Sequence, residues 1–294
     1  MGDTVSGYAQ LRYTSVDGLA LAARDYPAAS GPARLPVICI HGLTRNAADF
    51  DELAPLLARQ SRRVLALDVR GRGESARDPN PENYNPVTYA GDVAKLMNDL
   101  GIARAVFVGT SMGGLITMTL AMRNLDLVAA AVLNDIGPVM ARAGLERIAG
   151  YAGKTCQVGT WEEAATYVKG INQGAFPANA DAEWDKWARR AFAEAPDGAL
   201  ALRYDPHIAA SLQQGKLRPT SMLARLAFKR LSRHRPTLLI RGTLSDLVED
   251  RQADYMRRTA PGMQYAEVPN VGHAPMLTEP AALAALDGFL AQVP

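Results

Sequence analysis

The chain carries a serine in a setting that is typical of a nucleophile. Ser111 lies in the segment Gly109-Thr110-Ser111-Met112-Gly113-Gly114, between the apolar run 105–108 and the helical stretch 115–123. The glycines two positions before and after the serine allow a sharp turn and a close approach of strand to helix. This turn lifts the hydroxyl clear of the sheet. It also leaves the backbone N–H of Met112 at a helix N-terminus, where it can stabilise developing negative charge.

A nucleophilic serine needs a base, because a hydroxyl barely ionises near neutral pH. Of the four histidines, His273 is the best placed, since it follows the short apolar strand 265–268 in a loop that contains glycine and proline. His41 lies upstream of the serine, and we expect it to brace its own loop through hydrogen bonds. His207 and His234 lie in a helical middle section.

The base in turn needs an acid that orients it, and two aspartates are candidates. Asp246 follows the predicted buried strand 236–242 and precedes His273 by 27 residues, which is enough for one helix and one strand. Asp135 follows another predicted strand and competes for the same role. We predict Asp246 as the acid and keep Asp135 as the alternative, because strand-end carboxylates are geometrically similar when judged from sequence alone.

A second donor for the developing negative charge is expected from the loop after an earlier strand. The apolar run 37–40 ends in the segment His41-Gly42-Leu43-Thr44-Arg45-Asn46. We predict that the backbone N–H of Leu43 is this donor. Gly42 allows the main chain to approach a substrate closely.

These residues together resemble the α/β-hydrolase fold family. Residues 41–43 are similar to its oxyanion loop and residues 109–113 to its nucleophile elbow, while Asp246 and His273 match the positions of its acid and base. The chain order of serine, aspartate and histidine is also that of the family. Residues 68–75, Asp-Val-Arg-Gly-Arg-Gly-Glu-Ser, resemble its D-x-R-G-x-G-x-S loop. We expect that loop to be structural, because Asp68 precedes the serine and fits no triad order of the family.

The remaining sequence predicts an α/β fold that brings these residues together. Residues 10–14 and 19–24 are expected to form an opening hairpin. Further apolar runs alternate with helical patterns, which favours a mostly parallel sheet covered on both faces. These runs are 37–40, 64–67, 105–108, 129–133, 238–240 and 265–268. Such sheets bind ligands beyond the carboxyl ends of their strands, where all the candidate residues fall.

The strand pattern disappears between residues 138 and 235. Apolar residues recur at helical spacing within 161–168 and 184–192, which predicts an all-helical insertion. The expected core domain therefore comprises residues 1–137 and 236–294. Resemblance to the family implies that the insertion forms a cap over the active site.

The composition fits one enzyme that acts on small molecules. The 294 residues are 48% hydrophobic, enough for the core of one α/β domain with an insertion. A net charge of +2 argues against a nucleic-acid partner, and the lack of a membrane span or leader pattern predicts a cytoplasmic protein. Cys39 and Cys156 predict no disulfide framework. Because histidines and cysteines show no paired spacing, we expect neither a metal nor another cofactor.

These features predict a serine hydrolase that cleaves carboxylic esters of small to medium molecules through an acyl-enzyme. Serine at the elbow excludes the dehalogenases and epoxide hydrolases of the fold, which attack through aspartate. A lactonase or a carbon–carbon bond hydrolase of the same fold is the alternative. A ligand receptor is a third hypothesis, which is disfavoured because a binding module does not require a complete triad.

Overall fold

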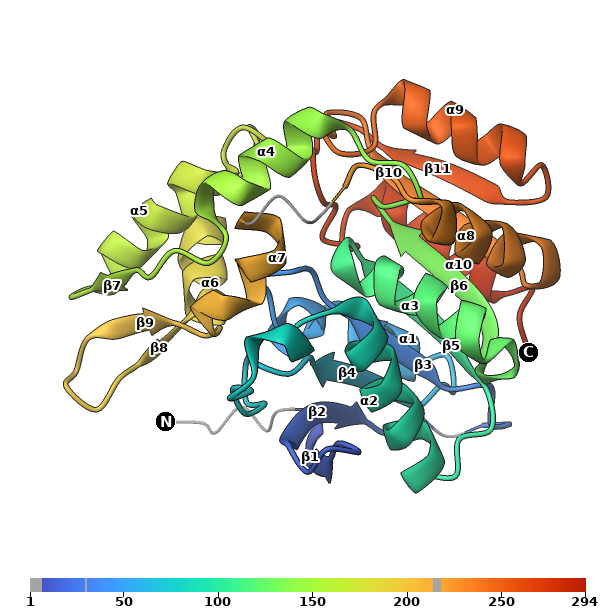
Figure 1. The fold of residues 1–294 in the computed structure, drawn as a ribbon, viewed down its shortest axis with the longest axis horizontal. Helices are drawn as coiled ribbons and strands as arrows, with labels where there is room; N and C mark the ends of the chain where they lie inside the picture. Colours follow the sequence, from blue (N-terminus) through green and yellow to red (C-terminus); the bar gives the residue numbers. More distant parts are fainter. Residues whose placement is uncertain (1–6, 30, 214–217) are drawn as a thin grey trace.

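A computed structural model describes residues 7–29, 31–213 and 218–294 of the chain. Among these residues, eight strands form one sheet in the order β1-β2-β4-β3-β5-β6-β10-β11 (Figure 1). The strands are β1 (Ala9–Thr14), β2 (Ala20–Tyr26), β3 (Val37–Ile40), β4 (Val64–Asp68), β5 (Ala105–Thr110), β6 (Val128–Asn134), β10 (Thr237–Gly242) and β11 (Gln264–Val268). The β1–β2 and β2–β4 pairs are antiparallel and the others are parallel. The predicted hairpin and mostly parallel sheet are confirmed.

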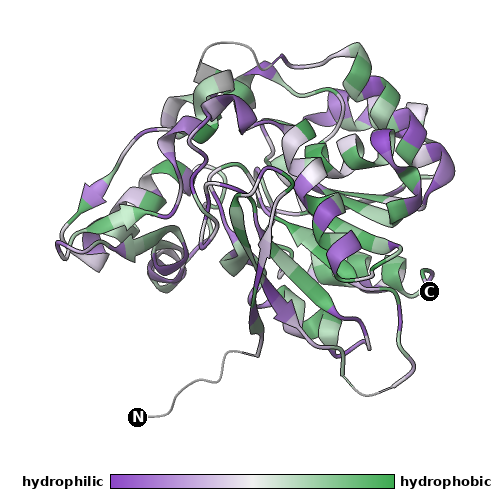
Figure 2. Cartoon of the chain, turned by 60° about the horizontal axis from the view of Figure 1, so that its bottom comes forward, coloured by the Kyte–Doolittle hydropathy of each residue, from purple (hydrophilic) through white to green (hydrophobic). Residues whose placement is uncertain are grey.

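The central strands are buried on both faces, which explains their continuous apolar runs. In β5, Val106 and Val108 pack into one hydrophobic cluster, and Ala105 and Phe107 pack into the other. This alternation follows from the two-residue period of a strand. Hydrophobic residues accordingly run along the central strands in Figure 2.

Helices cover both faces of the sheet, as the sequence predicts. The first face carries α2 (Pro86–Asp99), α3 (Met112–Arg123), α8 (Met222–His234) and α9 (Asp250–Thr259), and the second carries α1 (Leu53–Ala58) and α10 (Pro280–Leu290). Val93, Ile116, Phe228 and Met256 are buried in the cluster on the first face. Phe289 belongs to the cluster on the second. Each helix therefore buries one apolar stripe against the strands.

A separate group of elements extends from one end of the sheet (Figure 1). It contains α4 (Arg142–Tyr151), β7 (Gln157–Val158), α5 (Trp161–Asn172), α6 (Asp181–Ala191), β8 (Phe192–Glu194), β9 (Leu200–Leu202) and α7 (Ala210–Gln213). Aromatic side chains from α6 pack together, with the ring centres of Trp184 and Trp187 5.2 Å apart. Phe176 packs edge-on against Trp187 at 4.7 Å. The helical spacing of these residues in the sequence therefore reflects burial within this group.

The prediction of an all-helical insertion is wrong in one respect. Among the described residues of this region, β7, β9 and β8 form a three-stranded antiparallel sheet. These strands have only two or three residues, too short for an alternating pattern to appear in the sequence. In addition, α8 lies within the range 138–235 but packs in the same core cluster as α3. Residues 214–217 of that range lie outside the described part of the chain.

In the described part of the chain, no helix combines the length and the hydrophobicity needed to cross a bilayer. Both cysteines are free, with Cys39 buried in β3 and Cys156 half-buried. Burial raises the pKa of the Cys39 thiol, so this side chain behaves as a small apolar core residue.

Candidate active site

Ser111 lies at the corner between β5 and α3 with a backbone φ of +51° and ψ of −113°. Positive φ is uncommon for a residue with a side chain and requires support from its surroundings. A Cβ at Gly109 would lie 2.5 Å from the carbonyl carbon of Gly113, and one at Gly113 would lie 2.0 Å from the carbonyl oxygen of Ile40. The structure thus confirms that both glycines are needed for the close approach of strand and helix.

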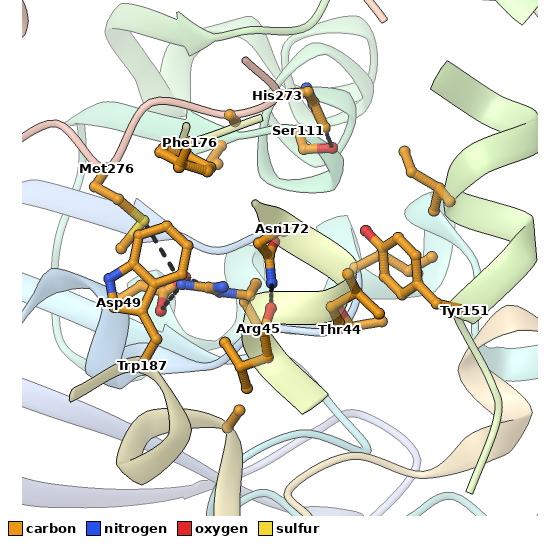
Figure 3. A pocket seen from close by; sticks show the side chains of 18 of the residues that line it. Thr44, Arg45, Asp49, Ser111, Tyr151, Asn172, Phe176, Trp187, His273 and Met276 are labelled. Carbon is orange, nitrogen blue, oxygen red and sulfur yellow. Dashed lines mark hydrogen bonds and ion pairs between the residues drawn. The ribbon is translucent and has the colours of Figure 1, made fainter. Parts of the chain in front are cut away.

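Three side chains from separate strand ends form a hydrogen-bonded chain. The Oγ of Ser111 lies 2.8 Å from Nε2 of His273, and Nδ1 of His273 lies 2.8 Å from Oδ2 of Asp135. The side chain of His273 is 8% exposed and that of Asp135 is fully buried. Figure 3 shows Ser111 and His273 in contact at one side of a cavity. When Nδ1–H donates to the carboxylate, Nε2 is left with a lone pair directed at the serine hydroxyl.

Asp135 directly follows β6 and is fixed by further hydrogen bonds. Its Oδ1 accepts from the backbone N–H of Gly242 at 3.0 Å, and its Oδ2 accepts from the hydroxyl of Ser245 at 2.5 Å. Both donors lie at the end of the neighbouring strand β10 or just after it. The orientation of the carboxylate towards His273 is therefore set by the core sheet.

The structure corrects the choice of Asp246 as the acid. The carboxylate that is hydrogen-bonded to His273 belongs to Asp135, whereas Asp246 forms a two-point ion pair with Arg147 of α4, with Nη2 of the arginine 2.9 Å from Oδ1. Burial acts to raise the pKa of the Asp246 carboxyl, but the hydrogen bonds and charge of Arg147 lower it overall. Because β6 and β10 are parallel neighbours, both aspartates reach the same sheet edge, and strand-end position alone does not distinguish them.

Of the two residues predicted to donate a backbone N–H to developing negative charge, one follows Ser111 in the chain and the other lines the same cavity. Met112 is the first residue of α3 and Leu43 lines the same cavity as Ser111. The carbonyl oxygen of Leu43 accepts a hydrogen bond from Nε of Arg72 at 3.0 Å, which holds this loop in place. The role of the two N–H groups remains a prediction.

His41 braces its own loop after β3, as expected from the sequence. Its Nδ1–H donates to the carbonyl oxygen of Gly42 at 2.7 Å, and its Nε2 accepts from the backbone N–H of Val69 at 3.1 Å. The side chain is fully buried, and burial lowers its pKa to about 4. A neutral imidazole is therefore part of the folded structure.

The loop 68–75 is structural, also as expected. The carboxylate of Asp68 accepts from the backbone N–H groups of Ala47 at 2.7 Å and Glu74 at 2.9 Å. Arg70 is 1% exposed and is surrounded by the carboxylates of Asp17, Asp78 and Asp92. This network fastens the loop and, among the described residues, has no hydrogen bond to Ser111, His273 or Asp135.

A cavity with about 90 Å³ of free volume lies in front of Ser111 and His273. Its wall combines residues of the core with Tyr151, Asn172 and Trp187 from α4, α5 and α6 (Figure 3). Most of the lining is apolar or aromatic, as in small-molecule sites. The charged side chain of Arg45 also lines it. Arg45 was not predicted as a site residue, although its position two residues after Leu43 in the sequence was a usable signal.

Metal ligation is not supported in the described part of the chain, because no group of three or more histidine, cysteine, aspartate or glutamate side chains there could hold an ion.

Comparisons with known proteins identify the family of the chain. A family model described as "alpha/beta hydrolase fold" matches residues 36–280. The chain is 33% identical over 261 residues to 3-hydroxybutyrate-oligomer hydrolase of Cupriavidus necator, covering 86% of this chain and 87% of the relative. It is 28% identical over 244 residues to 2-(acetamidomethylene)succinate hydrolase of Mesorhizobium japonicum, covering 83% and 82% of the two chains.

A solved structure gives the same result at the level of the fold. The crystal structure of an α/β hydrolase from Novosphingobium aromaticivorans is similar with a TM-score of 0.90 and 38% sequence identity, and the match covers 98% of this chain and 100% of the other. The chain therefore belongs to the α/β-hydrolase fold family.

Proposed function

We propose that this protein is a serine hydrolase that cleaves carboxylic esters of small to medium molecules through an acyl-enzyme. The observation that carries this proposal is the hydrogen-bonded chain of Ser111, His273 and Asp135 beside a cavity. The three groups correspond in type and contact to a nucleophile, a general base and an acid that orients the base.

In this mechanism His273 Nε2 removes the proton of Ser111 as Oγ attacks the ester carbonyl. The carboxylate of Asp135 keeps the proton on Nδ1 and stabilises the imidazolium that forms. The N–H groups of Leu43 and Met112 stabilise the oxyanion. His273 then passes its proton to the leaving alcohol oxygen as the C–O bond breaks. Water, activated by the same histidine, hydrolyses the acyl-enzyme and restores the serine.

The surroundings of the triad favour a small substrate. The cavity is enclosed by core residues on one side and by α4, α5 and α6 on the other, which supports our proposal that the inserted segment acts as a cap. An enclosed space of this size suits a short acyl group better than a long lipid chain. The relative named 3-hydroxybutyrate-oligomer hydrolase supports esters of short hydroxy acids as the first candidates.

The test is hydrolysis of p-nitrophenyl acetate, butyrate, hexanoate and octanoate, together with a 3-hydroxybutyrate dimer, by wild type and Ser111→Ala. We expect the shorter esters to be turned over, with a loss of about 10⁴-fold or more in kcat for the variant. Trapped acyl groups should appear on Ser111 by mass spectrometry. Retention of ester hydrolysis by Ser111→Ala would rule out the proposal.

The same experiment includes lactones and carbon–carbon ring-cleavage substrates, because those reactions use the same triad. Turnover of these compounds with no activity on open-chain esters would move the assignment to a lactonase or a carbon–carbon bond hydrolase. Ligand binding by the wild type without turnover or acylation would point to a receptor.

A further inference from the structure

We infer that Arg45 binds a carboxylate of the substrate, so that the preferred esters carry a second, free carboxylate near the scissile carbonyl. This inference rests on the proposed ester hydrolysis at Ser111. It adds a substrate class, small esters that carry a free carboxylate on the acyl or the alcohol side, to the proposed reaction.

Arg45 lies close enough to the nucleophile to contact the same substrate. A Cβ placed on Gly42 would lie 3.6 Å from Cγ of Arg45 and 3.7 Å from Cβ of Ser111, so these two atoms are within about 7 Å of each other. Both residues line the same cavity. Figure 3 shows the guanidinium of Arg45 extending along the cavity towards Trp187 and Asp49, away from the serine. A short carbon chain could therefore join a carbonyl at Ser111 to an anion at Arg45.

The guanidinium of Arg45 has donors that no described residue of the protein uses. Its Nε donates to Oδ2 of Asp49 at 2.7 Å, and its Nη2 donates to Oδ1 of Asp49 at 2.9 Å and more weakly to Sδ of Met276 at 3.6 Å. Within the described residues, Nη1 and its two hydrogens have no hydrogen-bond partner. Since the side chain is only 23% exposed, these donors favour an acceptor that brings its own negative charge.

The guanidinium is also held in a fixed orientation. Asp49 binds one edge at two points, and the ring of Trp187 lies 5.0 Å from the guanidinium carbon. Burial acts to lower the pKa of Arg45, but the charge and hydrogen bonds of Asp49 raise it overall, so the group stays cationic. A donor that is already oriented loses little side-chain entropy when a ligand binds.

Among its described residues, the rest of the cavity wall offers no other cationic side chain for a substrate carboxylate. Among the described residues that line it, the charged groups are Arg45 and Asp49, and His273 is committed to the triad. Both oxygens of Asp49 already accept from Arg45. The nearby Arg147 is paired with Asp246. Among the charged side chains of the described wall, Arg45 is therefore the one with hydrogen-bond donors available to a substrate.

The test uses ester pairs that differ only in charge. One pair is mono-p-nitrophenyl glutarate and its ω-amide, which place the carboxylate on the acyl side. The other is 3-(butyryloxy)butanoate and its amide, which place it on the alcohol side. Wild type is compared with the double variant Arg45→Met, Asp49→Asn. Both members of the ion pair are replaced because Arg45→Met alone would leave the carboxylate of Asp49 buried and unpaired.

We expect the preference of wild type for the anionic member, measured as the ratio of kcat/KM values, to fall by about 10- to 100-fold in the double variant, mainly through KM. The pair that shows this loss identifies the side of the ester that Arg45 contacts. A matched control removes the exposed pair of α6, Arg189→Met with Asp185→Asn, whose Nε–Oδ2 distance is 3.2 Å. The preference should be unchanged in this control. Circular dichroism and thermal unfolding verify that each variant is folded.

The outcomes separate this inference from the proposed function. If wild type hydrolyses the neutral esters but does not prefer the anionic ones, or if the double variant keeps the preference, Arg45 is structural and the inference is wrong while the ester hydrolysis stands. If wild type hydrolyses no member of either pair and no p-nitrophenyl ester, the proposed function itself fails. Calorimetry measures the binding of glutarate to Ser111→Ala without turnover. Binding that is lost when Arg45→Met and Asp49→Asn are added to this variant supports the proposed carboxylate site.

Discussion

Asp135→Asn is the substitution that tests the triad most directly. The change is nearly isosteric, and the structure determines how the new amide would be oriented. The N–H of Gly242 donates to Oδ1, so this position must keep the amide oxygen. The amide nitrogen then replaces Oδ2, which faces Nδ1 of His273 at 2.8 Å. Because this nitrogen is a donor, Nδ1 must become an acceptor.

The expected loss of rate follows from this tautomer. With its proton on Nε2, His273 faces the Ser111 hydroxyl with a donor and cannot act as the base. Loss of the correct tautomer costs about 10⁴-fold in kcat, or roughly 5 kcal/mol of transition-state stabilisation. Asp246→Asn should behave differently, since its ion pair with Arg147 is about one-third exposed on both sides and is worth at most about 1 kcal/mol. We expect less than about a tenfold change in kcat for that variant.

The assay is steady-state hydrolysis of a p-nitrophenyl ester by wild type and both variants at one pH. Thermal unfolding monitored by circular dichroism verifies that Asp135→Asn is folded, since the residue is buried. If Asp246→Asn loses more kcat than Asp135→Asn, the acid in the working enzyme is Asp246. Equal, small losses in both variants would also refute this reasoning, because they would show that neither carboxylate sets the tautomer.

Two further predictions concern stability. Gly113→Ala should lower the free energy of unfolding by about 3 kcal/mol, because the new Cβ would lie 2.0 Å from the backbone oxygen of Ile40. Urea unfolding measures this loss. Gly91→Ala in α2 is the control, since open space surrounds that position and the change should not be destabilising. The pKa of His41 is about 4 in the folded protein, whereas that of an unfolded histidine is about 6.5. As the pH falls, the unfolded chain therefore binds more protons than the folded one. The free energy of unfolding should consequently fall by about 2–3 kcal/mol between about pH 7 and about pH 4.5. His41→Gln, whose amide oxygen can still accept from Val69, lacks this titration, and an unchanged wild-type-minus-variant difference across that range would contradict the prediction.

Much of the fold was predictable because its signals are local. The runs at 37–40, 64–67 and 105–108 are continuous and apolar, and each became a buried parallel strand. The turn at Ser111 was equally predictable, since the need for glycine at positions 109 and 113 arises from steric contacts of the local backbone. The strands β7 to β9 were not predictable, because strands of two or three residues are too short to show an alternating pattern; in addition, β7 pairs with β9 across more than 40 residues, although β8 and β9 form a short local hairpin.

The acid could not be chosen by sequence because the deciding interactions span the chain. Asp135 is selected by donors at Gly242 and Ser245, more than 100 residues away. Asp246 is occupied by Arg147 of α4, which lies 99 residues earlier in the chain. Both aspartates follow strands that end at the same sheet edge, so a rule based on strand ends admits either of them.

The position of Asp246 also explains what that carboxylate does instead. Its ion pair with Arg147 joins the loop after β10 to α4, and its backbone carbonyl accepts the N–H of Gly144 from the same helix at 2.9 Å. A Cβ on Gly144 would lie 2.7 Å from that carbonyl oxygen, so helix and loop touch along their backbones. Since α4 contributes Ile148 and Tyr151 to the cavity wall, the contacts of Asp246 with α4 help to hold that part of the wall in position. Of the two carboxylates at this sheet edge, Asp135 is therefore hydrogen-bonded to the imidazole of His273, and Asp246 fastens a helix that lines the cavity.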